Sequence, residues 1–142
     1  MSPDRPSGYS GTPLKKKLGI KDHDKLAVYG CDEDYRNLVG LPVDTVIETV
    51  LSEDSSYSFI HLFFTQLEDL ATHYPAYYDK LEKEGMMWIS WPKRSAKVDT
   101  DLNRDLIRNY ILERGLVDVK VASVNEKWSA LKFVFRVKDR GR

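Results

Sequence analysis

Two strongly apolar segments on either side of a helical repeat constrain this chain more than any other feature. Residues 57–65 read YSFIHLFFT and are apolar almost throughout, which is typical of a buried strand. From 67 to 81, apolar residues recur at steps of three and four, which gives one apolar helical stripe. Residues 86–91, MMWISW, form a second apolar run. Strand, helix and strand in this order predict a right-handed βαβ unit and a parallel sheet.

The remaining segments extend this pattern at both ends. Short apolar runs at 25–30 and 45–50 predict two earlier strands. At the other end, 117–124 and 129–137 alternate apolar and polar residues around a short turn, which is typical of a hairpin with one solvated face. The predicted fold is therefore α/β, with a mostly parallel Rossmann-like sheet flanked by helices and ending in an antiparallel hairpin.

Local signals predict where the helices begin and end. Short helices are expected at 13–19 and 32–40. We expect Pro75 to kink the long helix or split it, and Gly85 to cap its end. A further helix starts where Asp99 or Thr100 can cap it, and closes at Gly115. In the hairpin, alternation places the valines at 117, 119 and 121 on one side of the sheet.

Length and charge limit the classes of function. With 142 residues, the chain suits one α/β domain over 14–138, a flexible arm over 1–13 and a frayed tail over 139–142. Lys+Arg and Asp+Glu both number 22, so we do not expect nucleic acid as a partner. No apolar run approaches the roughly 20 residues of a membrane-spanning helix, and residues 1–12 have no apolar signal region. The single Cys31 suits a reducing cytoplasm, and one cysteine with three histidines predicts no zinc site.

The second half of the chain resembles the second half of class I S-adenosylmethionine methyltransferases, which end their seven-stranded sheet in a similar hairpin. GMMWISW and GLVDVKVASV…WSALKFVFR would be its last strands. The whole chain also resembles the DUF3052 family of small bacterial proteins. That resemblance rests on GYSGTPLKKKLGIK, HLFFT, WISWPKR, TDLNRDLIR, GLVDVKVASV and WSALKFVFR. It implies a cytoplasmic bacterial protein and brings no established activity.

A methyltransferase holds its cofactor on a glycine-rich turn after the first strand, because only glycine lets the backbone approach so closely. Here that turn has one glycine, Gly30, which is more typical of an ordinary turn at a strand end than of a cofactor cradle. The acidic residue expected after the second strand could be Glu48 or Glu53, and the exit of the next strand reads FFTQ rather than acidic. S-adenosylmethionine is therefore a candidate cofactor whose cradle departs from the pattern.

The carboxyl ends of parallel strands form the crevice in which α/β proteins bind ligands. The residues predicted to surround that crevice, as a ligand-binding hypothesis, are Gly30, Thr65, Ser90, Trp91, Lys93, Arg94 and Thr100. A helix start beside Lys and Arg favours an anion, and a Trp face can stack on a nucleobase. The alternative is that Trp91 fills space above the sheet while Lys93 and Arg94 are solvated charges.

Other reactive side chains have structural alternatives. His61 lies inside an apolar strand and is more typical of a hydrogen-bonded core histidine than of a general base. Cys31 has no basic neighbour in sequence and is interpreted as structural. Asp99 and Asp101 suit helix capping, or a magnesium ion on a weak signal. The lysines at 15–17 suit a solvated helix face, or contact with an acidic partner or nucleic acid.

Two functions follow. The first is a non-catalytic protein that binds a small anionic ligand or a protein partner at the carboxyl edge of the sheet. The alternative is an S-adenosylmethionine-dependent methyltransferase with an atypical cradle, completed by the glycines of GYSGTP at 8–13. No catalytic residue is predicted. The position of residues 8–13 would discriminate between the two.

Overall fold

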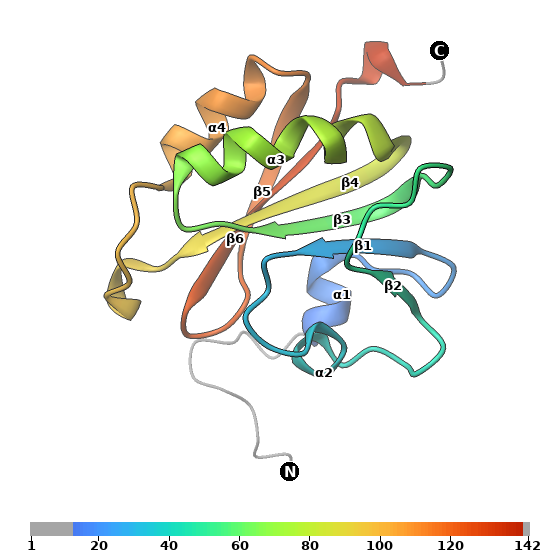
Figure 1. Cartoon of the computed structure of the whole chain (residues 1–142), viewed down its shortest axis with the longest axis horizontal. Helices are drawn as coiled ribbons and strands as arrows, with labels where there is room; N and C mark the ends of the chain where they lie inside the picture. Colours follow the sequence, from blue (N-terminus) through green and yellow to red (C-terminus); the bar gives the residue numbers. More distant parts are fainter. Residues whose placement is uncertain (1–12, 141–142) are drawn as a thin grey trace.

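A six-stranded sheet runs through the molecule in the order β2-β1-β3-β4-β6-β5 (Figure 1). The computed structural model describes residues 13–140. Strands β2, β1, β3 and β4 are parallel to one another, and β6 is antiparallel to both β4 and β5. This confirms the predicted fold class. The strands are β1 Lys25–Tyr29, β2 Val46–Glu48, β3 Tyr57–Phe63, β4 Leu81–Pro92, β5 Leu116–Ser123 and β6 Trp128–Phe135.

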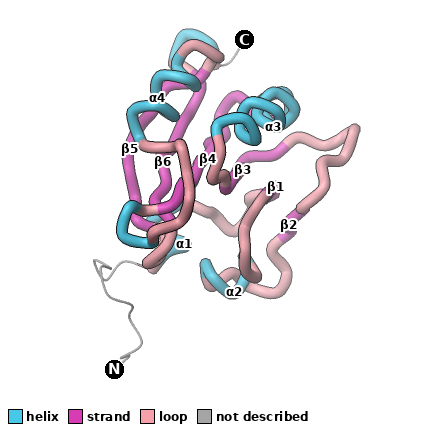
Figure 2. The backbone as a smooth tube through the Cα atoms, turned by 60° about the vertical axis from the view of Figure 1, so that its left-hand side comes forward, coloured by secondary structure: helices cyan, strands magenta, loops and turns pink. Residues whose placement is uncertain are grey.

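Helices cover both faces of the sheet (Figures 1 and 2). Two helices of five residues, α1 (Leu14–Leu18) and α2 (Tyr35–Val39), lie on one face, which we call the short-helix face. The opposite, long-helix face carries α3 (Leu67–Lys80) and α4 (Arg104–Leu112). Among residues 13–140 no helix has both the length and the apolar character needed to cross a membrane.

Each face has its own core. On the long-helix face, Leu70 and Tyr74 of α3 and Ile107 of α4 pack against Leu131 and Phe133 of β6. On the short-helix face, the core includes Leu14, Leu18, Phe59, Trp88 and Trp128. The indole N–H of Trp88 donates to the carbonyl of Leu18 at 2.9 Å, which ties α1 to the centre of the sheet.

The long helix differs from its prediction at both Pro75 and Gly85. Pro75 is exposed and lies inside one helix, α3, which it does not divide. Buried contacts of Leu70, Tyr74 and Tyr77 on both sides of the proline hold the helix to the sheet, and such packing can outweigh the roughly 3 kcal/mol cost of a proline. The helix ends at Lys80, so Gly85 is not its cap.

Gly85 instead lies within β4, close to β3. A Cβ atom there would be 2.7 Å from the carbonyl oxygen of Ser58. The register of the two strands also shifts between Tyr57 and Phe59. The glycine therefore permits a close approach of two backbones where the strand pairing is irregular.

The last helix and the hairpin also contain corrections. Asn103, and neither Asp99 nor Thr100, caps α4, since its side chain accepts the N–H of Leu106 at 2.9 Å. In β5 the register shifts between Asp118 and Lys120, and a bulge interrupts the predicted alternation. The side chains of Val119 and Val121 are consequently 51% and 49% exposed.

Candidate functional site

Three parallel strands, β1, β3 and β4, end at the same edge of the sheet. From β1 the chain moves outward to β2 and then crosses back to β3 on the other side of β1. The segment after β1 leads to α2 on the short-helix face, and the segment after β3 leads to α3 on the long-helix face (Figure 1). The strand order thus reverses at β1, which is where open α/β sheets bind ligands.

A cavity of about 410 Å³ lies at the end of β1, within the usual size range of small-molecule sites. We call it the β1 cavity. Its lining includes Gly30, Cys31, Glu33 and Asp34 after β1, and Thr49 after β2. Arg36 also lines the cavity, and its guanidinium donates to the carbonyls of Pro42 and Thr45. The two carboxylates favour hydroxyl groups and positive charge in a ligand.

Gly30 is required by the packing of the chain itself. Its φ is +81°, and a Cβ atom would be 2.3 Å from the carbonyl oxygen of Phe63. The glycine allows the ends of β1 and β3 to meet while the chain turns into the β1 cavity. Gly30 therefore serves as an ordinary turn at the end of a strand, although it also borders the β1 cavity.

The segment after β1 is attached to the β5–β6 turn, about a hundred residues later in the chain. The carboxylate of Asp32 accepts from the ammonium of Lys127 at 2.5 Å and from the indole N–H of Trp128 at 3.2 Å. The hydrogen bond from Lys127 is the main cause of a lowered pKa of Asp32. Asn125 donates to Glu33 at 3.4 Å. These contacts hold one wall of the β1 cavity, and sequence reasoning missed them.

Cys31 is half-buried in the wall of the β1 cavity. Burial raises the pKa of its thiol, and the negative charges of Asp32, Glu33 and Asp34 raise it further. The backbone hydrogen bond with Glu33 opposes this only in part. The thiol is therefore a poor thiolate nucleophile at neutral pH, as the interpretation of Cys31 as structural requires.

A second cavity, of about 430 Å³, lies between the end of β4 and the start of α4. Residues 91–94 and 100–103 contribute most of its lining. The hydroxyl of Thr100 donates to the carbonyl of Thr65 at 2.5 Å and accepts the N–H of Leu102 at 3.1 Å. These bonds fix the segment before α4 against the end of β3. We call this space the β4 cavity.

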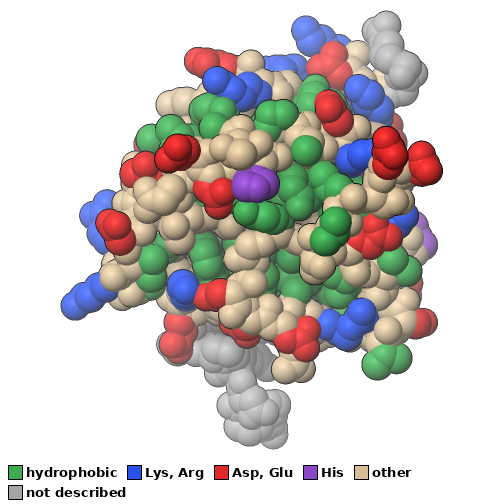
Figure 3. Space-filling model, viewed as in Figure 1, with side chains coloured by type: hydrophobic (Ala, Val, Ile, Leu, Met, Phe, Trp, Pro, Cys, Tyr) green, Lys and Arg blue, Asp and Glu red, His purple; other side chains and the backbone are tan. Residues whose placement is uncertain are grey.

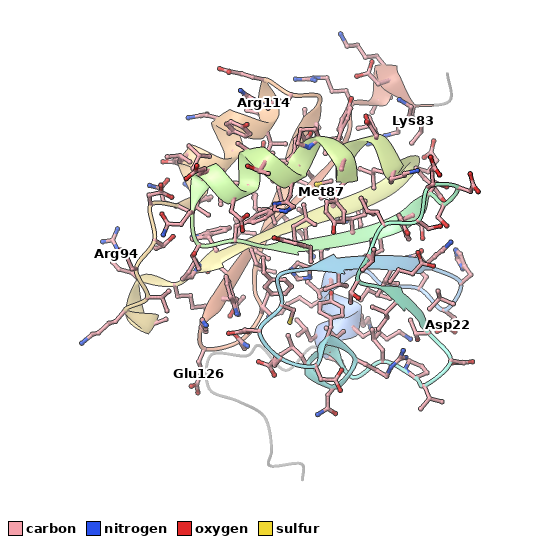
Figure 4. All side chains as sticks on the ribbon, in the orientation of Figure 1. Asp22, Lys83, Met87, Arg94, Arg114 and Glu126 are labelled. Atoms are coloured by element: carbon pink, nitrogen blue, oxygen red, sulfur yellow. The ribbon has the colours of Figure 1, made fainter. Side chains whose placement is uncertain are left out.

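The basic residues of the β4 cavity point in different directions. Lys93 donates to the hydroxyl of Ser123 at 2.6 Å, on the β5–β6 hairpin. Arg94 is exposed and extends outward from its loop (Figure 4). Trp91 is only 8% exposed and belongs to the core of the long-helix face. The predicted residues therefore do not surround one crevice: Gly30 borders the β1 cavity, and Trp91, Lys93, Arg94 and Thr100 border the β4 cavity.

Ser90 lies in the core of the short-helix face and not in either cavity. Its hydroxyl and Nε2 of His61 are 2.8 Å apart, and Nδ1 of His61 is 2.8 Å from the hydroxyl of Tyr35. All three side chains are buried. Burial lowers the pKa of His61 to about 3, so the ring is neutral at pH 7. His61 is a hydrogen-bonded core histidine, with tyrosine and serine as its partners.

The acidic residues considered for a ribose or a metal have other contacts. Glu48 accepts from the hydroxyl of Tyr57 and lies 3.7 Å from the ammonium of Lys25, away from the β1 cavity. Asp101 accepts the N–H of Leu67 at the start of α3, at 2.8 Å. Within residues 13–140, no three His, Cys, Asp or Glu side chains cluster closely enough to hold a metal ion. Residues 8–12 of the GYSGTP segment lie outside the described residues.

Comparison with known proteins identifies a fold and no family. No protein-family model matches the chain, and no curated protein matches it. Three solved structures are similar at the level of the fold. The ribosomal protein L11 methylase from Lactobacillus delbrueckii subsp. bulgaricus is 12% identical, with 85% of this chain and 74% of that chain covered and a TM-score of 0.53.

The other two are also methyltransferases. The CcbJ methyltransferase from Streptomyces caelestis is 7% identical, with 87% of each chain covered and a TM-score of 0.55. The glycopeptide N-methyltransferase MtfA, complexed with sinefungin, is 8% identical, with 96% of this chain and 99% of that chain covered and a TM-score of 0.55. At such identities the likeness shows the fold alone. The chain has a methyltransferase-like α/β core, and its resemblance to DUF3052 stays a prediction.

Proposed function

We propose that this chain binds S-adenosylmethionine in the β1 cavity and uses it as a methyl donor. The observation that carries the proposal is a cavity with two carboxylates at the reversal of the strand order, in a fold shared with methyltransferases. This favours the methyltransferase alternative over a protein without catalysis. The supporting likeness is one of fold, so the proposal depends on the residues of the cavity.

The residues of the β1 cavity fit this cofactor in part. The carboxylates of Glu33 and Asp34 and the hydroxyl of Thr49 can receive or donate hydrogen bonds to ribose hydroxyls, and the carboxylates suit a positively charged ligand. When bound, S-adenosylmethionine supplies a methyl group activated by its positively charged sulfur. The task of the chain is then to hold and orient the reactants.

In a methyltransferase cradle the glycine after the first strand leaves room for the cofactor, and in this chain that room is occupied. The space beside Gly30 holds the carbonyl of Phe63, so that glycine does not admit a ligand there. Binding would instead depend on the backbone of 31–34 and its acidic side chains. Since Lys127 and Trp128 hold Asp32, this segment is positioned before any ligand arrives.

The test is a calorimetric titration of S-adenosylmethionine and S-adenosylhomocysteine into the purified protein. We expect a micromolar dissociation constant, about −8 kcal/mol, and at least tenfold weaker binding by Glu33→Gln/Asp34→Asn. The matched control, Glu82→Gln/Glu84→Gln, removes two carboxylates at the start of β4 and should bind like the parent. Absence of heat with both ligands, in a folded protein, would overturn the proposal.

A second candidate is a small anionic ligand, or an acidic segment of a protein partner, in the β4 cavity. The specific observation in its favour is that Arg94 lines the same cavity as Asn103, the N-cap of α4. Inorganic phosphate and adenine nucleotides should then raise the thermal midpoint of the parent and leave that of Lys93→Ala/Arg94→Ala unchanged. Equal shifts in both proteins would exclude this candidate.

A further inference from the structure

Lysines gather where the short-helix face meets the β5–β6 hairpin. Lys120 of β5 and Lys132 of β6 are directly opposite each other in the strand register. Like charges in such cross-strand positions destabilise a sheet. Lys120 is exposed and Lys132 is half-buried, so water screens this repulsion only in part.

Two more lysines meet at the end of β5. The ammonium of Lys17, from α1, donates to the carbonyl of Ser123 at 3.1 Å, and that of Lys93 donates to the hydroxyl of the same serine at 2.6 Å. Ser123 is three residues beyond Lys120, about 10 Å along an extended strand. We call Lys17, Lys93, Lys120 and Lys132 together the lysine surface.

Three of these four lysines are not held in an ion pair by the described residues, although Glu126 borders a cavity together with Lys93. Lys93, Lys120 and Lys132 form no ion pair within the described part of the chain, although the sequence has 22 acidic residues. Burial lowers the pKa of Lys17, and the charges of Lys93 and Lys120 lower it further. Burial, then Lys120 and Lys21, lower the pKa of Lys132 in the same way. A repulsive arrangement that a sequence could easily avoid is typical of a functional surface.

We propose that the lysine surface binds the phosphate backbone of a nucleic acid strand without reading its base sequence. Lysine is depleted in protein–protein interfaces and is a common phosphate ligand, which favours phosphates over an acidic protein. The large hydrophobic side chains exposed on β5 are valines, Val119 and Val121, so this strand offers no aromatic platform for bases. The zero net charge of the chain thus conceals a local basic surface.

This inference does not depend on binding of S-adenosylmethionine. The test is fluorescence anisotropy with a labelled single-stranded RNA of twelve nucleotides in mixed sequence, titrated at several salt concentrations. Four lysine–phosphate contacts predict that log K falls with log salt at a slope of about −3. The variant Lys93→Gln/Lys120→Gln/Lys132→Gln should bind at least tenfold more weakly, and its slope should be shallower by about 2.

A matched variant removes three lysines elsewhere. Lys80→Gln/Lys83→Gln/Lys138→Gln causes the same loss of charge, and Lys83 lies over the ring of Phe135, which belongs to the core of the long-helix face. It should bind the RNA like the parent. Replacing the three surface lysines by arginine should preserve binding, and shuffled RNA sequences should bind equally well. Circular dichroism verifies that each variant is folded.

Several outcomes would overturn the proposal. Equal losses in the two triple variants would show an effect of net charge only. Failure of the parent to bind RNA would exclude a nucleic acid, as would tighter binding to polyglutamate or to vesicles of phosphatidylserine than to RNA. Strong preference for one RNA sequence would contradict recognition of the backbone alone.

Discussion

The two faces of the sheet are built differently. On the long-helix face, helices of 14 and 9 residues cover a core of mainly aliphatic and aromatic side chains. On the short-helix face, two helices of five residues cover a core that contains the hydrogen-bonded series of Tyr35, His61 and Ser90. Helices so short have little stability of their own, so their placement depends on tertiary contacts.

The β1 cavity and the lysine surface both belong to only one of these faces. The β1 cavity opens beside α2, and the lysine surface lies beside α1, both on the short-helix face. On the side of the molecule shown in Figure 3, acidic and basic residues are interspersed around hydrophobic side chains near the middle of the view. A face held by specific polar contacts can present fixed charges, whereas an apolar face provides rigidity.

The largest expected effect is a loss of stability at low pH, caused by His61 on the short-helix face. Unfolded chains protonate histidine below pH 6.5, while folded His61 accepts a proton only below about 3. Stability is therefore complete above pH 6.5 and is lost as the pH falls toward 3, by about 4 kcal/mol. Urea unfolding at several pH values should show this loss in the parent, and a smaller loss in His61→Gln, which does not titrate.

Ile107→Ala tests whether this sensitivity belongs to one face. Ile107 is fully buried on the long-helix face, and its truncation should cost about 2–5 kcal/mol through a cavity. Its free energy of unfolding should run parallel to that of the parent at all pH values. If His61→Gln and the parent lose equal free energy between pH 7 and pH 4, the histidine is not the acid-sensitive group.

A second, smaller effect compares glycines on the two faces. Gly30→Ala should cost about 3 kcal/mol, because φ is positive and the new Cβ meets the backbone oxygen of Phe63. Gly115→Ala, also at positive φ, would contact the ring of half-buried Tyr78, which can move, so about 1–2 kcal/mol is expected. Gly40→Ala, with open space around it, measures the cost of φ alone. Equal losses in urea unfolding at all three positions would show that the Phe63 contact is not decisive.

Much of the fold could be predicted because the apolar patterns are local. The strand at 57–65, the helical stripe at 67–81 and the final hairpin each bury a continuous set of side chains, which fixes their periodicity. Pro75 and Gly85 misled because tertiary contacts decided both positions.

The site was harder to predict, since its contacts join residues far apart in sequence. Nothing near Asp32 indicates that Lys127 and Trp128 will hold it. Ser90 lies near the end of β4, as expected. Because side chains alternate along the strand, its hydroxyl points toward His61 in the core of the short-helix face. Lys93 was assigned to a crevice, and its ammonium lies on Ser123 of the hairpin. The contacts of Asp32, Ser90 and Lys93 all depend on strand order and pairing, which a single sequence does not specify.

The smallest expected effect tests whether the lysine surface is maintained against stability. Lys120→Glu would place a carboxylate opposite Lys132 in the register of β5 and β6, replacing repulsion by attraction. We expect a gain of about 0.5 kcal/mol in urea unfolding, together with loss of RNA binding. Lys83→Glu, beside Phe135 on the long-helix face, should leave RNA binding unchanged. A variant that becomes more stable as it loses its ligand would show that the lysines are retained for binding, since folding alone would favour the carboxylate.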